Sequence, residues 1–214
     1  MGLSLPDRAG ATRLVIVRHA EPDASAHGRC YGCLDVGLSA SGRKHAEDLG
    51  NAIASLGVEA VYASPLRRSL ETARLVGKRL GLELRVRPDL RELDFGELEG
   101  RTYDEIAAGE PALYRTWMET PTAVRFPGGE SYADLHERVG NVLARIRQDH
   151  PDSVVAVVAH GGVNRVLLAV ALGLRGDEIF GIEQDYGRIS VVDWSEEAAV
   201  VHVVNADLAR AAAW

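Results

Sequence analysis

Two histidines and an arginine stand directly after apolar runs of the chain. The run LVIV at 14–17 leads into Arg18 and His19, and the run VVAVVA at 154–159 leads into His160 and two glycines. Such aliphatic runs, rich in β-branched residues, are typical of strands that are buried on both faces. Charged and imidazole groups seldom follow so abruptly unless the end of the strand opens into a wet crevice.

The two strand ends together suggest an anion site. Ligands of open α/β sheets bind beyond the carboxyl ends of the strands. A helix expected at 162–172 begins just after Gly161, so its free N–H groups and positive dipole end face the same crevice. Phosphate is the small anion that we expect there. The alternative is that the histidines are hydrogen-bonded structural residues and that Arg18 pairs with a surface carboxylate. The residues alone leave both interpretations open.

Strands and helices alternate along the chain, which predicts an α/β fold: a three-layer α/β/α sandwich around a mainly parallel sheet. The last two strands are expected to add an antiparallel edge. Thr102-x-x-Glu105 and Ser131-x-x-Asp134 are capping boxes, and Ser64-Pro65 is expected to begin a helix. The predicted strands are 13–18, 58–63, 82–87, 154–159, 188–194 and 199–204; the predicted helices are 39–56, 64–80, a short one after Thr102, 131–149 and 162–172.

Composition narrows the class of protein. The 214 residues, 46% hydrophobic and 26% charged, suit one domain over residues 1–214. The net charge of −7 gives no basic footprint for nucleic acid. No apolar run is as long as a membrane span, and residues 1–13 lack the apolar region of a secretory signal. We therefore expect a cytoplasmic enzyme that binds neither nucleic acid nor membranes.

Cys30 and Cys33 form a C-x-x-C, which suggests a redox pair or half of a zinc site. No second C-x-x-C follows, and His27 and His45 stand at irregular spacing for zinc. The motif also does not join a strand to a helix, as a thioredoxin-like pair would. We expect two reduced cysteines without chemistry, and no metal site.

Several blocks together resemble a known family. Arg18-His19-Ala20 resembles the Arg-His-Gly signature of the histidine phosphatase superfamily, the phosphoglycerate mutase-like enzymes. Further blocks follow in the family's order, and the resemblance spans residues 13 to about 204. These blocks are GRCYGCLDVGLSASG at 28–42, SPLRRSLETA at 64–73, LRELDFGELEG at 90–100, FPGGESYADLHERV at 126–139 and VVAHGGVNRVLL at 157–168.

The resemblance implies roles for individual residues. His19 is similar to the nucleophile that becomes phosphohistidine, and Glu92 to the proton donor. Arg18, Arg68 and His160, preferably protonated, are implied to bind the phosphoryl oxygens. The resemblance implies neither cofactor nor metal. Substrate contacts are further implied for Ser25, Arg29, Tyr31, Gly32 and Gly161.

The chain departs from the family pattern at three positions. Ala20 replaces the usual glycine, and we expect the pocket to survive this small change. Pro22 replaces a common threonine, and Ser25 stands where an asparagine often helps to hold phosphate.

The resemblance implies a phosphomonoesterase that hydrolyses small phosphate esters, such as sugar, nucleoside-like or glycerate phosphates, through phosphohistidine. It is closest to the small phosphatase branch, which includes α-ribazole-phosphate and sugar-phosphate phosphatases. One alternative is a cofactor-dependent phosphoglycerate mutase; the short segment at 101–126 lacks the long basic insertion that mutases of this family use. Another is a non-catalytic phosphate-binding relative, which would not need Glu92. A small phosphorylated metabolite is the expected partner, and a homodimer is one option.

Overall fold

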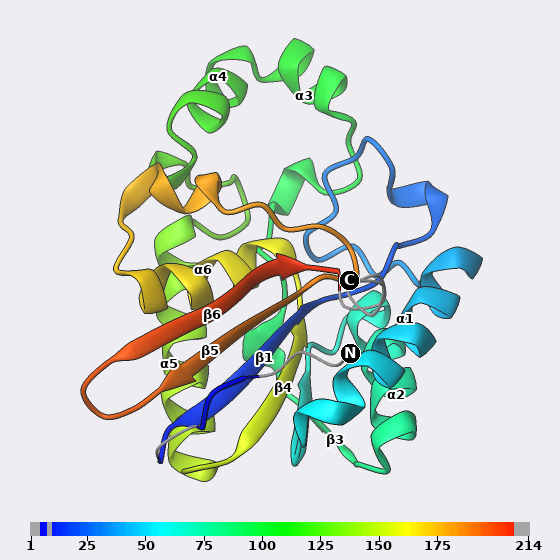
Figure 1. Ribbon diagram of the computed structural model, residues 1–214. Helices are drawn as coiled ribbons and strands as arrows, with labels where there is room; N and C mark the ends of the chain where they lie inside the picture. Colours follow the sequence, from blue (N-terminus) through cyan, green and yellow to red (C-terminus); the bar gives the residue numbers. More distant parts are fainter. Residues whose placement is uncertain (1–4, 8–9, 208–214) are drawn as a thin grey trace.

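A six-stranded mixed sheet lies at the centre of the computed structural model, which describes residues 5–7 and 10–207 (Figure 1). Its order is β3-β2-β4-β1-β5-β6, so the two strands that precede the histidines are neighbours. Residues 1–4, part of the segment inspected for a secretory signal, lie outside the described residues. The strands are β1 (Thr12–Arg18), β2 (Ala60–Ala63), β3 (Leu84–Val86), β4 (Val154–Ala159), β5 (Ile189–Trp194) and β6 (Ala199–Ala206).

The first four strands of the chain run parallel to one another, and β5 runs in the opposite direction to them. β4 pairs parallel with β1 and β2, whereas β5 pairs antiparallel with β1 and β6 with β5. The register places Arg18 opposite Ala159. His19 and His160 therefore leave the same edge of the sheet side by side. The predicted antiparallel edge is confirmed.

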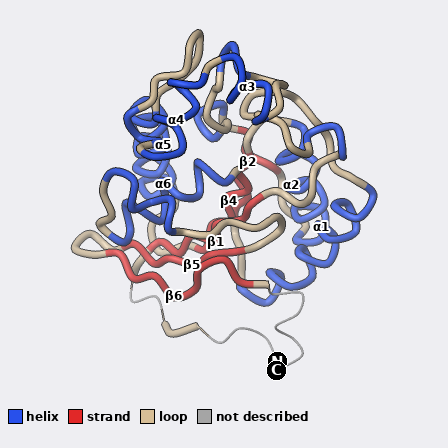
Figure 2. Tube along the Cα trace, turned by 90° about the horizontal axis from the view of Figure 1, so that it is seen from above, coloured by secondary structure: helices blue, strands red, loops and turns tan. Residues whose placement is uncertain are grey.

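Helices cover both faces of the sheet, because side chains of β1 alternate between two hydrophobic cores. Leu14 and Ile16 pack beneath α5 (Tyr132–Asp149) and α6 (Gly161–Leu172). The alternate residues of the same strand, Val15 and Val17, pack on the other face of the sheet beneath α1 (Ala40–Ile53) and α2 (Arg67–Leu80) (Figure 2). Each fully buried aliphatic side chain stabilises the fold by roughly 1.5–3 kcal/mol. The predicted three-layer α/β/α sandwich is confirmed.

The two predicted capping boxes are confirmed: Thr102 and Ser131 cap α3 (Tyr103–Gly109) and α5. At the start of α1, Ser39 accepts a hydrogen bond from the Gly42 N–H. After α3 the chain forms a further short helix, α4 (Pro111–Glu119). Figure 1 shows α3 and α4 arching over one end of the sheet.

The predicted start of α2 is wrong by two residues. The Ser64 hydroxyl accepts a hydrogen bond from the Leu66 N–H, so Pro65 lies in a turn and the helix begins at Arg67. The face of α2 that is buried carries Arg68, Ser69, Thr72, Ala73, Val76 and Gly77.

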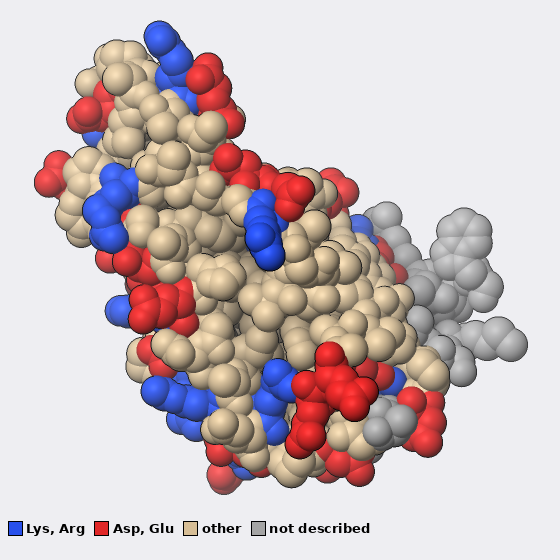
Figure 3. Space-filling model, turned by 90° about the vertical axis from the view of Figure 1, so that its left-hand side faces the viewer, with Lys and Arg blue, Asp and Glu red and all other residues tan. Residues whose placement is uncertain are grey.

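The described part of the chain contains no helix that is long and apolar enough to cross a membrane. Acidic and basic side chains lie next to one another on the face shown in Figure 3.

Candidate active site

His19 follows β1 and is almost completely buried, with 2% of its surface exposed. Its Nδ1 lies 2.8 Å from the Ala20 carbonyl oxygen. A carbonyl only accepts hydrogen bonds, so Nδ1 carries the proton and the lone pair is on Nε2. Burial, followed by the charges of Arg68 and Arg18, holds the pKa of His19 well below its usual range. The ring is therefore a neutral imidazole with a fixed tautomer.

His160 is the N-cap of α6, and its ring centroid lies 5.2 Å from that of His19. Both ring nitrogens are buried and find no hydrogen-bond partner within the described part of the chain. Burial lowers the pKa of His160 well below its usual value, and Arg68, His19 and Arg18 lower it further. The protonated form expected from the resemblance is thus disfavoured in the ligand-free protein. Neutral imidazole still offers one N–H donor to an anion.

Arg68 is fully buried near the start of α2, where backbone carbonyls fix its guanidinium. Its Nη1 donates to the Leu34 oxygen at 2.8 Å and its Nη2 to the Gly32 oxygen at 2.6 Å. Arg18 is held similarly: its Nη1 donates to the Gln184 carbonyl, and its guanidinium lies 4.1 Å from the centroid of the Tyr186 ring. The Nε atoms of both arginines are buried without a partner among the described residues.

Glu92 approaches the same place from the loop after β3. One carboxylate oxygen accepts the Gly162 N–H at 2.9 Å, and the other accepts the Leu93 N–H at 2.9 Å. A Cβ on Gly162 would lie 2.5 Å from the first contact it meets, the Glu92 Oε1 atom. Glycine at this position therefore lets the carboxylate reach the N-terminus of α6.

These groups surround a cavity of about 250 Å³. The structure brings together most of the site residues expected from sequence: Arg18, His19, Tyr31, Arg68, Glu92 and Gly161 all line it. His160 is fully buried beside His19. Three aromatic residues, Phe95, Trp117 and Phe126, also line the cavity, and we call them the aromatic wall. Their ring centroids lie 4.9–5.3 Å apart.

Three residues implied to contact substrate lie away from the lining. Ser25 is exposed in a short 3-10 helix, and its backbone N–H is bound to the Asp23 carboxylate. Arg29 is exposed and donates to the Gly100 carbonyl at 2.7 Å. Gly32 supplies the carbonyl that holds Arg68, and a Cβ there would lie 1.8 Å from the Leu93 oxygen.

Ala20, which replaces the usual glycine of the resemblance, is buried and well accommodated. The non-glycine residues with positive φ in the described part of the chain are Asp152 and Asn205, so Ala20 needs no left-handed backbone. Its N–H donates to the Thr72 hydroxyl at 3.1 Å, and its carbonyl orients His19. The cavity is formed with Ala20 at this position.

Comparison with known proteins agrees with this geometry. The family model of the histidine phosphatase superfamily (branch 1) matches residues 14–207. The chain belongs to the histidine phosphatase superfamily. It is 32% identical to phosphoserine phosphatase 1 of Hydrogenobacter thermophilus over 193 residues, which cover 90% of this chain and 92% of that protein. The chain spans 55% of the length of some other curated relatives.

Two solved structures of this superfamily show the same fold. A mycobacterial glucosyl-3-phosphoglycerate phosphatase superposes with a TM-score of 0.84 at 29% identity, covering 92% of this chain and 100% of that one. The α-ribazole phosphatase of Shigella flexneri superposes with a TM-score of 0.82 at 28% identity, covering 91% and 96%.

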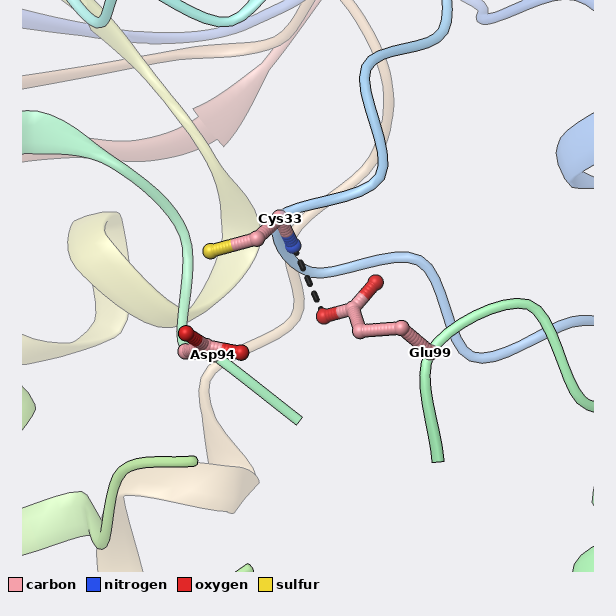
Figure 4. Close-up of side chains that lie close together, drawn as sticks. All are labelled: Cys33, Asp94 and Glu99. Atoms are coloured by element: carbon pink, nitrogen blue, oxygen red, sulfur yellow. Dashed lines mark hydrogen bonds between the residues drawn. The ribbon is translucent and has the colours of Figure 1, made fainter. Parts of the chain in front are cut away.

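Both cysteines of this histidine phosphatase are free thiols. Burial raises the pKa of Cys33 to about 11, and it raises that of Cys30 as well. Cys33, Asp94 and Glu99 bring potential metal ligands within 4.8 Å of one another (Figure 4). The Glu99 oxygens, however, accept the backbone N–H groups of Cys33 at 2.8 Å and Leu34 at 3.0 Å. This cluster therefore ties the loop around Cys33 to the loop that carries Glu92.

Besides the aromatic residues of the wall, sequence reasoning missed Tyr186, Tyr132 and Arg165. Tyr186 lies against His19, 5.4 Å between ring centroids, and forms a hydrogen bond with Tyr31; it comes from a loop that shows no pattern. Tyr132 and Arg165 also line the cavity. Arg165 could have been found, because it follows Gly161 by one helical turn on α6.

Proposed function

We propose that the chain is a metal-independent phosphomonoesterase that hydrolyses small phosphate esters through a phosphohistidine on His19. The observation that carries this proposal is the neutral imidazole of His19, whose Nδ1 is committed to the Ala20 carbonyl while the ring lines the cavity. A neutral nucleophile is not repelled by a phosphate dianion, and its fixed tautomer directs Nε2 to the phosphorus.

In the first step the Nε2–P bond forms and the P–O bond to the leaving group breaks. The unpartnered Nε–H groups of Arg18 and Arg68, and one N–H of His160, would donate to the phosphoryl oxygens. The N-terminus of α6 adds its positive dipole end. These cations and donors stabilise the charge on the phosphoryl group in the transition state, so the proposal requires no metal.

Glu92 would serve both steps as the proton carrier. As an acid it protonates the leaving oxygen. In the second step a water attacks the phosphorus, the Glu92 carboxylate takes one proton from it, and the Nε2–P bond breaks. Inorganic phosphate leaves, and both residues return to their starting states.

The class of substrate follows from the size of the cavity and from the relatives. The relatives are named for phosphoserine, glucosyl-3-phosphoglycerate and α-ribazole as substrates, all small metabolites. We therefore infer a small phosphorylated metabolite as the partner. Because phosphate esters are charged and stay inside cells, we infer that the enzyme acts in the cytoplasm.

Release of phosphate from p-nitrophenyl phosphate and from a panel of metabolite esters tests the proposal. We expect turnover without added cofactor and without inhibition by EDTA. With 3-phosphoglycerate and catalytic 2,3-bisphosphoglycerate, little 2-phosphoglycerate should form. Isomerisation that is faster than phosphate release would overturn the proposal and favour a mutase. Phosphate binding without turnover of any ester would favour a non-catalytic relative.

A further inference from the structure

Arg165 is a cation of the cavity that the proposed chemistry does not use. It lies half-buried on α6, and its Nε donates to the Ile182 carbonyl at 3.0 Å. Its Nη1 lies 3.3 Å from the point that a Cβ on Gly161 would occupy. No carboxylate of the described residues forms an ion pair with Arg165. The guanidinium is therefore held in place while both Nη groups are available to a ligand.

Tyr132 presents a second polar group that has no protein partner. The side chain is 7% exposed, and its hydroxyl oxygen is buried with no hydrogen bond to the described residues. Its ring lies 5.5 Å from that of Phe180, whose ring also faces Arg165 at 5.8 Å. Burial and the Glu92 carboxylate raise the pKa of Tyr132, so the hydroxyl remains a neutral donor. A buried hydroxyl without a partner is unfavourable, and a ligand oxygen would satisfy it.

Arg165 lies near the start of α6, close to both Arg18 and Glu92. A Cβ on Gly161 would lie 3.3 Å from the Arg165 Nη1 atom and 3.7 Å from the Arg18 Cζ atom, and the next residue, Gly162, donates its N–H to Glu92. Burial lowers the pKa of Arg165, the Glu92 carboxylate acts in the opposite direction, and the charge of Arg18 lowers this pKa as well. The arginine charges that lower the pKa values of both His19 and His160 are those of Arg68 and Arg18. Since Glu92 is the proposed donor to the leaving oxygen, Arg165 and Tyr132 lie where the leaving group would extend.

We propose that Arg165 and Tyr132 form a second anion subsite, which binds a carboxylate on the leaving group of the phosphate ester. A guanidinium with two free Nη groups matches the two oxygens of a carboxylate, and the tyrosine hydroxyl adds one donor. The rest of the leaving group would contact the uncharged aromatic wall of Phe95, Trp117 and Phe126. The inference rests on the proposed function and specifies its substrate class: carboxylate-bearing phosphomonoesters.

A matched pair of esters isolates the carboxylate. 3-Phosphoglycerate and glycerol 3-phosphate differ only in a carboxylate that is replaced by a hydroxymethyl group, and phosphoserine and phosphoethanolamine form a second pair. We expect kcat/KM to favour the carboxylate member by roughly 10- to 100-fold, the range for a hydrogen bond to a charged group. The ratio within a pair cancels effects that are common to all phosphate esters.

Variants test whether the ratio of kcat/KM values within a pair depends on Arg165 and Tyr132. Arg165→Gln should bring the ratio close to one. Tyr132→Phe, which removes a single oxygen and keeps the ring, should lower the ratio by about tenfold, the lower end of the range for a hydrogen bond to a charged group. Arg74→Gln, which removes an exposed arginine on α2, is the matched control and should keep the ratio. An equal loss on both members of a pair in Arg165→Gln would overturn the inference, because it would place Arg165 at the phosphoryl group or in the fold.

The wild-type enzyme separates this inference from the proposed function. Turnover of p-nitrophenyl phosphate without a preference for carboxylate in either pair would overturn the inference alone. A preference for fructose 1,6-bisphosphate over fructose 6-phosphate, without one for carboxylate, would assign the subsite to a second phosphate instead and would also overturn it. No turnover of p-nitrophenyl phosphate or of any member of the pairs would overturn the proposed function itself.

Discussion

The two ends of the cavity are built in different ways. At the phosphate end, His19, His160 and Arg68 are at most 2% exposed and follow strand ends or begin helices. At the leaving-group end, Phe95 and Trp117 are only partly buried, and Phe180 is 40% exposed. These rings come from a loop, a short helix and a 3-10 helix.

This difference separates chemistry from selectivity. The groups at the phosphate end are held by the hydrophobic core and by backbone carbonyls, so they cannot change without cost to the fold. At the leaving-group end, Phe95, Trp117 and Phe180 stand on segments that tolerate substitution, whereas Tyr132 and Arg165 belong to the long helices α5 and α6. Members of one superfamily can therefore share a reaction while their substrates differ.

The largest expected effect is at the nucleophile. His19→Ala should lower kcat by roughly 10⁴-fold or more, because the binding groups that remain cannot form the covalent intermediate. Steady-state phosphate release from p-nitrophenyl phosphate checks this, with His136→Gln, an exposed histidine on α5, as the control. An unchanged rate in His19→Ala would contradict the mechanism.

Arg68→Met should lower both activity and stability. Loss of one fixed donor to the transition state typically costs about 10²- to 10³-fold in kcat. The carbonyls of Gly32, Tyr31 and Leu34 would also lose their donor, so the free energy of unfolding should fall by roughly 2–5 kcal/mol. Urea denaturation checks the second effect. Trp117→Ala at the leaving-group end should lower kcat and the free energy of unfolding by less than Arg68→Met does. The reverse order would contradict the difference that we draw between the two ends.

Glu92→Gln should lower kcat with alkyl phosphates by about 10²-fold or more, the usual scale for general acid catalysis. The loss should be smaller with p-nitrophenyl phosphate, whose leaving group needs little protonation. If both losses are equal, the amount of trapped phosphoenzyme decides. Accumulation would show that dephosphorylation limits both reactions, and its absence would show that Glu92 is structural.

The smallest expected effect is on the pH dependence of stability. His19 and His160 have folded-state pKa values well below the unfolded value of about 6.5. Their stabilisation is therefore complete above about pH 6.5 and is lost as the pH falls, by about 1.4 kcal/mol per histidine per pH unit. Unfolding free energies between pH 7.5 and 5.5 should show a smaller slope in His160→Gln than in the wild type. Equal slopes would indicate that the folded-state pKa of His160 is not lowered.

The sequence predicted the phosphate end better than the leaving-group end, for a physical reason. Buried strands and capped helices leave strong local patterns, so the ends of β1 and β4 and the starts of α5 and α6 were placed within a residue. Whether Tyr186 or Phe180 reaches the cavity depends on how loops fold over the sheet, and no local pattern encodes that. The start of α2 was misplaced because a serine hydroxyl accepts the same kind of backbone hydrogen bond in a turn as at a helix N-cap. Ser64 makes this bond in a turn.

The central claim is that phosphate is transferred to Nε2 of His19. Enzyme mixed with substrate and quenched in base should carry a phosphate that is stable to base and labile to acid, and ³¹P NMR of the denatured protein should assign it to Nε2. Peptide mapping should place it on His19, and His19→Ala should carry none. A phosphate on Nδ1 or on another residue, or phosphate release from His19→Ala at the wild-type rate, would contradict the account.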